Sequence, residues 1–406
     1  MPNPPTLRTR VAVGAVRTVN WLSRATHRGA GTVAGGRVGQ VLDGKLLDHL
    51  AAGRDVIVVS GTNGKTTTTA LIAAGWGSPV ATNATGANMV AGHVAALVTS
   101  TASHVVLEAD ESWLPEVVTR VSPRAVVLLN LSRDQLDRAG EVRQIAERWR
   151  RLFDDASTDG VVVVANANDP LVVYAAEVAA QVRWCDVPTV WRADAASCPM
   201  CTRPIVFDAA GWRSDCGFSR PRALTTTLGD LLRVDGVDAV LALEVPGEFN
   251  AANAAMAVTA LTVVGVAVPD AVTRMNGVVE VAGRFARRRW RERELRLVLA
   301  KNPAGFAAIL AMVEPKASEL WIAINDNVAD GRDPSWLYDA PFEILRSHPV
   351  VCLGTRRLDL ATRLDYAGVT PTVIDDLSSI AVGEAPVWLI ANYTAFSEWL
   401  ARSAPC

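Results

Sequence analysis

A short glycine-rich segment carries the residues best suited to chemistry. Residues 60–68, Ser-Gly-Thr-Asn-Gly-Lys-Thr-Thr-Thr, follow the apolar run 56–59 and precede an alanine- and leucine-rich stretch, an order that predicts strand, turn and helix. Glycines let backbone N–H groups converge on an anion, and the start of a helix adds a partial positive charge. The lysine offers a mobile cation to phosphates, and the next threonine offers a hydroxyl to Mg²⁺. We expect a nucleotide site made by Gly61, Thr62, Asn63, Gly64, Lys65, Thr66 and Thr67.

An acidic position is expected beside this turn. Residues 105–107 are predicted to form a strand, and Glu108 follows directly. In α/β sheets the carboxyl ends of strands carry the sites, and an acid at such an end is suited to hold Mg²⁺ directly or through water. We therefore expect Thr66 and Glu108 to hold Mg²⁺, and Lys65 and Glu108 to take part in catalysis.

Three cysteines form a pattern that is typical of a zinc ribbon. Cys198 and Cys201 are separated by two residues, and Cys216 precedes a glycine; two such turns can enclose a tetrahedral ion. The position three before Cys216 is Arg213, so the fourth ligand is uncertain, with Asp215 or Cys185 as candidates. The alternative is a ribbon without metal. Bound zinc would be structural.

An acidic loop lies late in the chain. Residues 325–339 contain the four aspartates Asp326, Asp330, Asp333 and Asp339. Four carboxylates in so short a loop repel one another unless they are solvated or matched by cations. A generic solvated loop is the alternative to a functional one.

These residues require α/β sheets to position them. From about residue 45 to 294, apolar runs alternate with helical stretches, which indicates a parallel sheet covered by helices. The strands expected there are residues 56–59, 105–107, 125–129 and 161–164. A ribbon-like insertion is expected at about 193–222. A second, Rossmann-like α/β domain is expected over 295–406, with strands at 295–299, 320–324, 350–353 and 387–390.

Composition limits the class of protein. The 406 residues are 50% hydrophobic, with a net charge of −2 that gives no reason to expect nucleic acid. No signal peptide, membrane span or disulfide framework is evident, which favours the cytoplasm. Residues 1–44 are basic, with six arginines and no acid before Asp43. They are expected either to form a helix with a solvated basic face or to lie near anionic lipid headgroups.

The glycine-rich segment resembles the loop of the Mur ligase family, the ATP-dependent ligases of peptidoglycan synthesis. Three further segments resemble that family: residues 166–170 near the nucleotide, residues 246–254 at the adenine, and Gly283-Arg284 at a hinge. The resemblance implies that ATP is bound also by Asn166, Asp169, Asn250, Asn253 and Arg284, although a plain turn is the alternative for residues 166–170. Gln135 stands where the family usually has a histidine, which puts the coordination of a second metal in doubt.

Within that family the chain resembles the MurT branch, through residues 301–305, residues 330–336 and the ribbon insertion. This branch is the ligase subunit of lipid II isoglutaminyl synthase and pairs with a GatD-type glutamine amidotransferase as a heterodimer. The resemblance implies that ATP activates the D-glutamate α-carboxyl of the lipid II stem peptide as an acyl phosphate at the inner face of the membrane. Ammonia from the partner then forms D-isoglutamine. It also implies that Asp333, with Asp330 as runner-up, supplies a catalytic carboxylate to the glutaminase.

Two other functions remain as alternatives. One is a stand-alone Mur-type ligase that adds an amino acid, and the other is a P-loop ATPase that acts as a scaffold. The sequence has no cysteine at a strand-to-helix elbow with a partner histidine, so ammonia is expected from solution or from another polypeptide.

Overall fold

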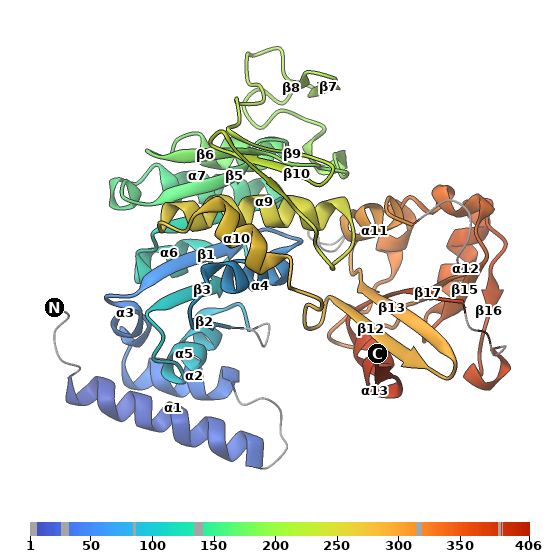
Figure 1. Cartoon of the computed structure of the whole chain (residues 1–406), viewed down its shortest axis with the longest axis horizontal. Helices are drawn as coiled ribbons and strands as arrows, with labels where there is room; N and C mark the ends of the chain where they lie inside the picture. The colour runs from blue at the N-terminus through green and yellow to red at the C-terminus, as the bar shows by residue number, and fades with distance from the viewer. Residues whose placement is uncertain are drawn as a thin grey trace. The chain divides into compact units, whose positions relative to one another are not determined.

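The computed structural model describes residues 6–25, 32–83, 87–133, 141–313, 319–380, 383 and 385–406. The chain forms two compact units, and the predicted α/β class is confirmed in both (Figure 1). We call them the N-terminal unit (Met1–Leu131, Val142–Leu243 and Phe249–Val278) and the C-terminal unit (Ser132–Glu141, Glu244–Glu248 and Val279–Cys406).

The N-terminal unit is built on a nine-stranded sheet in the order β11-β10-β9-β6-β5-β4-β1-β3-β2. Neighbours from β2 to β9 run parallel, whereas β9, β10 and β11 form an antiparallel meander at one edge. The strands are β1 (Asp55–Ser60), β2 (Val80–Thr82), β3 (His104–Glu108), β4 (Ala125–Leu128), β5 (Val162–Asn166), β6 (Val182–Asp186), β9 (Thr225–Leu228), β10 (Leu231–Val234) and β11 (Val237–Val240). The four strands expected from the sequence are confirmed as β1, β3, β4 and β5.

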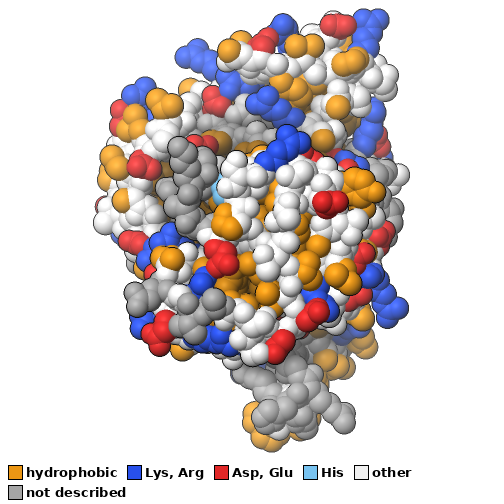
Figure 2. Space-filling view, turned by 90° about the vertical axis from the view of Figure 1, so that its right-hand side faces the viewer, with side chains coloured by type: hydrophobic (Ala, Val, Ile, Leu, Met, Phe, Trp, Pro, Cys, Tyr) orange, Lys and Arg blue, Asp and Glu red, His pale blue; other side chains and the backbone are white. Residues whose placement is uncertain are grey.

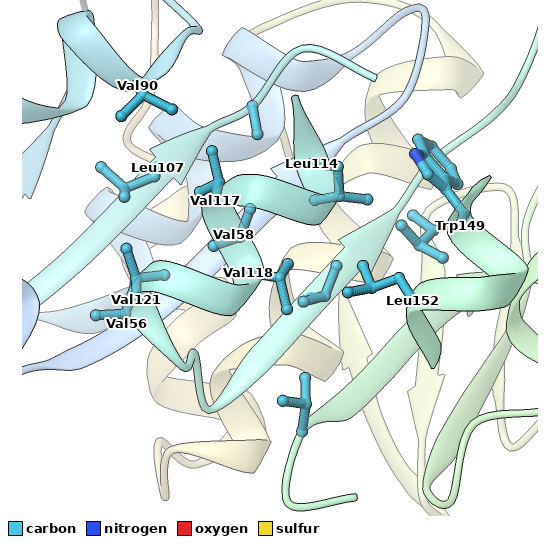
Figure 3. Close-up of a cluster of buried hydrophobic side chains, with 14 of the residues drawn as sticks. Val56, Val58, Val90, Leu107, Leu114, Val117, Val118, Val121, Trp149 and Leu152 are labelled. Carbon is cyan, nitrogen blue, oxygen red and sulfur yellow. The ribbon is translucent and has the colours of Figure 1, made fainter. Parts of the chain in front are cut away.

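Both faces of this sheet are covered by helices, because side chains along each strand alternate between two apolar cores. Val56 and Val58 of β1 belong to one core, and Ile57 and Val59 to the other. The first core includes residues of α3 (Leu46–Ala51), α5 (Val90–Val98), α6 (Leu114–Val121), α7 (Glu141–Phe153) and α8 (Pro170–Ala176). The second includes residues of α4 (Lys65–Trp76), α9 (Glu248–Val263) and α10 (Val268–Met275). Figure 3 shows Val56 and Val58 with the α6 side chains that cover them.

Two further features of this unit lie outside the sheet. The basic N-terminal segment forms α1 (Leu7–Ala25) and α2 (Thr32–Leu42); α1 packs on α2, and α2 packs on α5. The ribbon-like insertion contains the two-stranded hairpin β7 (Val206–Asp208) and β8 (Gly211–Arg213). Among the described residues, no helix is long and apolar enough to cross a membrane.

The C-terminal unit has a seven-stranded sheet in the order β16-β15-β14-β17-β13-β12-β18. Its strands are β12 (Phe285–Trp290), β13 (Arg293–Leu299), β14 (Leu320–Ala323), β15 (Val350–Leu353), β16 (Thr372–Val373), β17 (Val387–Ala391) and β18 (Ala404–Pro405). Its helices are α11 (Pro303–Leu310), α12 (Arg357–Tyr366) and α13 (Tyr393–Arg402). The four strands expected here are confirmed as β13, β14, β15 and β17. On the face in Figure 2, acidic and basic side chains are interspersed.

The arginine-rich stretch 287–293 belongs to the sheet of the C-terminal unit. It forms most of β12 and the turn into β13, an antiparallel pair in which Phe285 lies opposite Val298. Phe285 and Ala286 are buried, whereas Arg287 and Arg289 are exposed. The dense arginines obscured the strand because its outward positions are charged.

One titratable side chain lies inside the core of the N-terminal unit. His93 of α5 is fully buried, and its Nε2 lies 2.8 Å from the carbonyl oxygen of Glu108. A carbonyl only accepts, so Nε2 carries the proton and donates. Nδ1 has no hydrogen-bond partner among the described residues. Burial lowers the pKa of His93 from 6.5 to about 4, so the ring is neutral at physiological pH.

We expect His93 to make the fold acid-sensitive. Between pH 6.5 and 4 the unfolded chain holds this proton and the folded chain does not, so acidification favours unfolding. The free energy of unfolding should fall by about 3 kcal/mol across this window from His93 alone. Urea denaturation of wild type and His93→Gln at several pH values checks it. As the pH is lowered, the free energy of unfolding should fall more for wild type than for His93→Gln. An equal fall in both proteins would contradict the prediction.

Candidate functional site

At two positions, the loop after β1 has a backbone conformation that L side chains rarely adopt and glycine adopts readily. Gly61 has a φ of 140°, and Gly64, which caps α4, has a φ of 92°. A Cβ at Gly61 would lie 3.0 Å from the backbone of Asn130, and one at Gly64 would lie 2.6 Å from Oδ1 of Asn253. The loop is therefore held tightly against its neighbours and directed into the first turn of α4, an arrangement that suits binding of an anion.

Asn130 fixes this loop from the end of β4. Its carbonyl accepts from the Thr62 N–H, its Oδ1 accepts from the Asn63 N–H, and its Nδ2 donates to the Asn63 carbonyl, each at 2.9 Å. A role for Asn130 could not be predicted from local patterns, because its partner Asn63 lies 67 residues away in the chain. Residues 134–140, which include Gln135, lie outside the described residues.

Lys65 is buried at the base of the loop. Its Nζ donates to the carbonyl of Gly61 at 2.5 Å and lies 3.3 Å from Oε2 of Glu111. Glu111 is held by the indole of Trp149, which donates to its carbonyl at 2.9 Å. The ion pair with Glu111 thus positions the Lys65 ammonium beside the loop.

The side chains of Thr66 and Glu108, which we expect to hold Mg²⁺, are in direct contact. The Thr66 hydroxyl donates to Oε2 of Glu108 at 2.8 Å, and Glu108 is 3% exposed. The Asn83 side chain holds the Glu108 backbone, accepting from its N–H and donating to its carbonyl, both at 2.8 Å. A hydroxyl and a carboxylate at hydrogen-bond distance are oxygen donors of the kind Mg²⁺ prefers, so this pair fits the ion.

Asn166 and Asp169 lie in a tightly bonded turn at the end of β5. Asp169 caps α8 by accepting from the N–H groups of Leu171 and Val172, and its other oxygen accepts from the Leu131 N–H at 2.8 Å. Burial raises the pKa of Asp169 to about 6. Asn166 donates to the Leu129 carbonyl at 3.0 Å. Both side chains thus order the ends of β4 and β5.

The two asparagines of α9 lie together, and Asn253 reaches the glycine-rich loop. Nδ2 of Asn253 lies 3.3 Å from Oδ1 of Asn250, and both side chains are buried. Oδ1 of Asn253 faces Gly64. Arg284 belongs to the C-terminal unit, where its Nη1 donates to the Gly283 carbonyl at 3.2 Å.

The three cysteines of the insertion converge, with all Sγ atoms within 4.8 Å of one another. Sγ of Cys198 lies 3.7 Å from Sγ of Cys216, which matches the edge of about 3.8 Å in a tetrahedron with Zn–S bonds of about 2.3 Å. The three thiols therefore fit a zinc ion.

The side chain of Ser214 lies beside this cluster. Its Oγ lies 3.4 Å from Sγ of Cys201, and this hydrogen bond lowers the pKa of the Cys201 thiol to about 7. Neither expected fourth ligand belongs to the cluster. Asp215 is exposed and 3.6 Å from Arg203, while Cys185 is buried beside Thr259. Ser214 lies two positions before Cys216, whereas a second Cys-x-x-Cys turn would place a ligand three positions before it, at Arg213.

The acidic loop follows β14 in the C-terminal unit, and its aspartates differ in environment. Oδ1 of Asp330 accepts from the Thr394 N–H at 2.9 Å and Oδ2 from the Thr394 hydroxyl, which caps the first turn of α13. Asp333 is exposed, and its Oδ1 accepts from the Ser335 N–H at 2.9 Å. That bond holds the pKa of Asp333 below its usual value, so its carboxylate is charged and directed to solvent.

Buried amides anchor this loop to the sheet. Asn392, after β17, accepts from the Asn325 N–H at 3.1 Å and donates to the Asn325 carbonyl at 2.7 Å. Asn325 in turn contacts Glu398 and accepts from the Thr355 N–H at 3.0 Å. Asn325, the first residue of the loop, is therefore held by Asn392, Glu398 and Thr355.

Comparison with known proteins agrees with this geometry. Among curated proteins, the chain is 31% identical over 401 residues to the lipid II isoglutaminyl synthase (glutamine-hydrolyzing) subunit MurT of Staphylococcus aureus (strain COL), covering 91% of this chain and 90% of that protein. It is 27% identical to the MurT subunit of Streptococcus pneumoniae, covering 97% and 96%. The names of these relatives mark them as subunits of a complex.

Solved structures share the fold. A pseudomurein peptide ligase type C from Methanothermus fervidus superposes with a TM-score of 0.64 at 18% identity, covering 86% of this chain and 78% of that one. MurF from Acinetobacter baumannii gives 0.66 at 16% identity, covering 90% and 80%.

Family models match both units. The Mur ligase middle domain matches residues 59–261, and the MurT ligase C-terminal domain matches residues 299–396. Mur ligases are ATP-dependent ligases and typically use Mg²⁺. The chain belongs to the MurT family of Mur ligases.

Proposed function

We propose that this protein is the ligase subunit of a lipid II isoglutaminyl synthase. It uses ATP to convert the D-glutamate α-carboxyl of the lipid II stem peptide to an amide, through an acyl phosphate that ammonia attacks. The substrate is carried over from the names of the relatives, which the chain matches over nine-tenths of its length. Because lipid II is a membrane lipid, the reaction takes place at the inner face of the membrane.

The observation that best supports ligase chemistry is that Lys65, Thr66 and Glu108 lie together at the glycine-rich loop. Lys65 donates to the Gly61 carbonyl, and Thr66 donates to Glu108. We assign the β- and γ-phosphates of ATP to the loop amides and Lys65, and the adenine to Asn250 and Asn253. Thr66 and Glu108 would hold Mg²⁺, which neutralises phosphate charge when bound. Phosphoryl transfer of this kind depends mainly on positioning and on charge stabilisation. Arg284 is assigned to the γ-phosphate, while Asn166 and Asp169 order the floor of the site.

We propose a heterodimer with a GatD-type glutamine amidotransferase. A class I glutaminase uses a Cys-His pair, whose imidazole needs a carboxylate to fix its tautomer. Asp333 is assigned to that role because its carboxylate is exposed and charged. Asp330 is less suited, since both of its oxygens are bonded to Thr394.

The ribbon is assigned one structural zinc ion, held by Cys198, Cys201 and Cys216. The Ser214 hydroxyl, 3.4 Å from Sγ of Cys201, offers an oxygen donor beside them. We further propose three segments: a basic N-terminal segment, residues 1–44; a central ATP-binding domain, residues 45–294; and a C-terminal domain, residues 295–406.

Lys65→Ala should abolish amidation in a folded protein, because the cation beside the phosphates is lost. Loss of one such contact typically lowers the rate roughly 10²–10³-fold. The measurement is ATP- and ammonium-dependent amidation of lipid II. Lys45→Ala, at an exposed lysine, is the matched control and should retain full activity. Normal turnover of a folded Lys65→Ala protein at saturating ATP would contradict the nucleotide assignment.

Asp333→Asn should separate the two nitrogen sources. Glutamine-dependent amidation by the complex should be lost, whereas ammonium-dependent amidation should persist, because the carboxylate acts only on the partner's imidazole. Asp330→Asn removes the same charge but keeps a side chain that can cap α13, so it should retain both activities. If Asp330→Asn alone loses glutamine-dependent amidation and keeps ammonium-dependent amidation, the catalytic carboxylate is that of Asp330. If Asp333→Asn loses both activities equally, Asp333 acts in the ligase reaction instead.

Elemental analysis should find about one zinc per chain in protein purified without chelator. Ser214→Cys should bind zinc more tightly in competition with a chromogenic chelator, because a fourth thiolate replaces a weaker oxygen donor. Cys198→Ser should lose the ion. Asp215→Asn, at the exposed neighbour, should behave as wild type. A folded, metal-free wild-type chain would refute the zinc assignment.

A further inference from the structure

The outward face of α1 is apolar. Thr9, Ala12, Val16 and Asn20 are buried on its inner face. Four large apolar side chains on the outer face are exposed: Leu7 (79%), Val11 (54%), Trp21 (63%) and Leu22 (49%). Gly14 and Thr18 lie between them at helical spacing. The exposed residues therefore form one stripe along the helix, which we call the outer stripe, and the helix has a second apolar face opposite the one that packs on α2.

A stripe of this kind calls for an explanation. Single exposed apolar side chains are normal on protein surfaces, but an aligned set marks a binding surface. The end of α2 lies next to the start of α1, where Nε of Arg8 donates to the Leu42 carbonyl at 2.5 Å. Val41, which precedes Leu42 in the chain, is a further exposed apolar side chain, at 81%. In Figure 1, α1 is the dark blue helix that lies along α2 at the edge of the N-terminal unit.

The charged residues of the segment that forms α1 and α2 are all of one sign, since residues 1–42 contain arginines and no acid. Arg10 and Arg17 are seven residues apart, so they lie on the same flank of the helix, and Nη2 of Arg17 donates to the Val98 carbonyl at 3.3 Å, on the side of the protein. Arg8 lies on the other flank, and residues 1–42 contain no acid. A helix with an apolar face bordered by arginines matches a helix that lies in the interface of an anionic membrane.

We propose that the outer stripe of α1 binds the surface of a bilayer that contains anionic phospholipids. Trp21, Leu22, Val11 and Leu7 enter the headgroup region. The exposed Arg10 contacts phosphate groups, and Arg8 and Arg17, which also bond to protein carbonyls, add positive charge beside it. A second copy of this chain fits less well, because symmetric pairing of two α1 helices would bring their arginines together without an acid to match them. The inference rests on the proposed function in one respect: a lipid-borne substrate gives the surface its purpose.

Co-sedimentation of the full chain with vesicles tests this surface. Wild type should bind vesicles of phosphatidylglycerol mixed with phosphatidylcholine and bind phosphatidylcholine vesicles much more weakly. Trp21→Ser should weaken binding roughly tenfold, through lost apolar burial, and Arg10→Gln roughly fivefold, through one lost charge at the surface. Leu228→Ser is the matched control, because Leu228 is 81% exposed at the β9–β10 turn, and it should bind as wild type. Thermal melting verifies that each variant is folded.

The results separate this inference from the proposed function. If wild type does not bind anionic vesicles, if Leu228→Ser weakens binding as much as Trp21→Ser, or if light scattering shows a dimer that Trp21→Ser dissociates, the inference is overturned. Vesicle binding by wild type that Trp21→Ser and Arg10→Gln weaken supports it even when lipid II is not amidated, in which case the proposed function alone fails. Where both hold, Trp21→Ser should reduce amidation of lipid II in vesicles but not of lipid II dispersed in detergent.

Discussion

The parallel pairing of β1 with β3 and β4 is the constraint on which the proposed nucleotide site depends. In this register Val59 lies opposite Glu108 and Ser60 opposite Leu128. The loop that leaves β1 therefore meets an acid on one side and Asn130 on the other. A slip of one residue would turn every side chain of a strand to the other face. The two apolar cores prevent that slip, because each holds alternate residues of β1.

Much of this arrangement could be predicted from local patterns. Apolar runs located the parallel strands, since a strand buried on both faces is continuously apolar. The glycine-rich loop was readable because its backbone requires glycine at Gly61 and Gly64. The antiparallel meander β9–β11 was not predicted, because each of its strands has only four residues and none forms a long apolar run.

The residues that fix the site were harder to find. Asn83, Asn130 and Ser214 each act through partners that come close only after folding. A polar residue in a loop carries no periodic signal, so its role depends on tertiary neighbours that one sequence does not show. The order of Asp333 before Asp330 was already expected from the sequence, but its structural reason was not, because Asp330 is bonded to Thr394, 64 residues away.

The ribbon is joined to the rest of the N-terminal unit by more than its cysteines. The indole of Trp212 donates to the Ala167 carbonyl at 2.9 Å, inside the turn that contains Asn166 and Asp169. Trp212 also packs against Phe218, with ring centroids 4.9 Å apart, in a small core that includes Val173 of α8 and Cys198. Neither the indole hydrogen bond nor the ring contact requires a metal ion. The hairpin would therefore stay attached to the turn of Asn166 and Asp169 even in a ribbon that binds no metal.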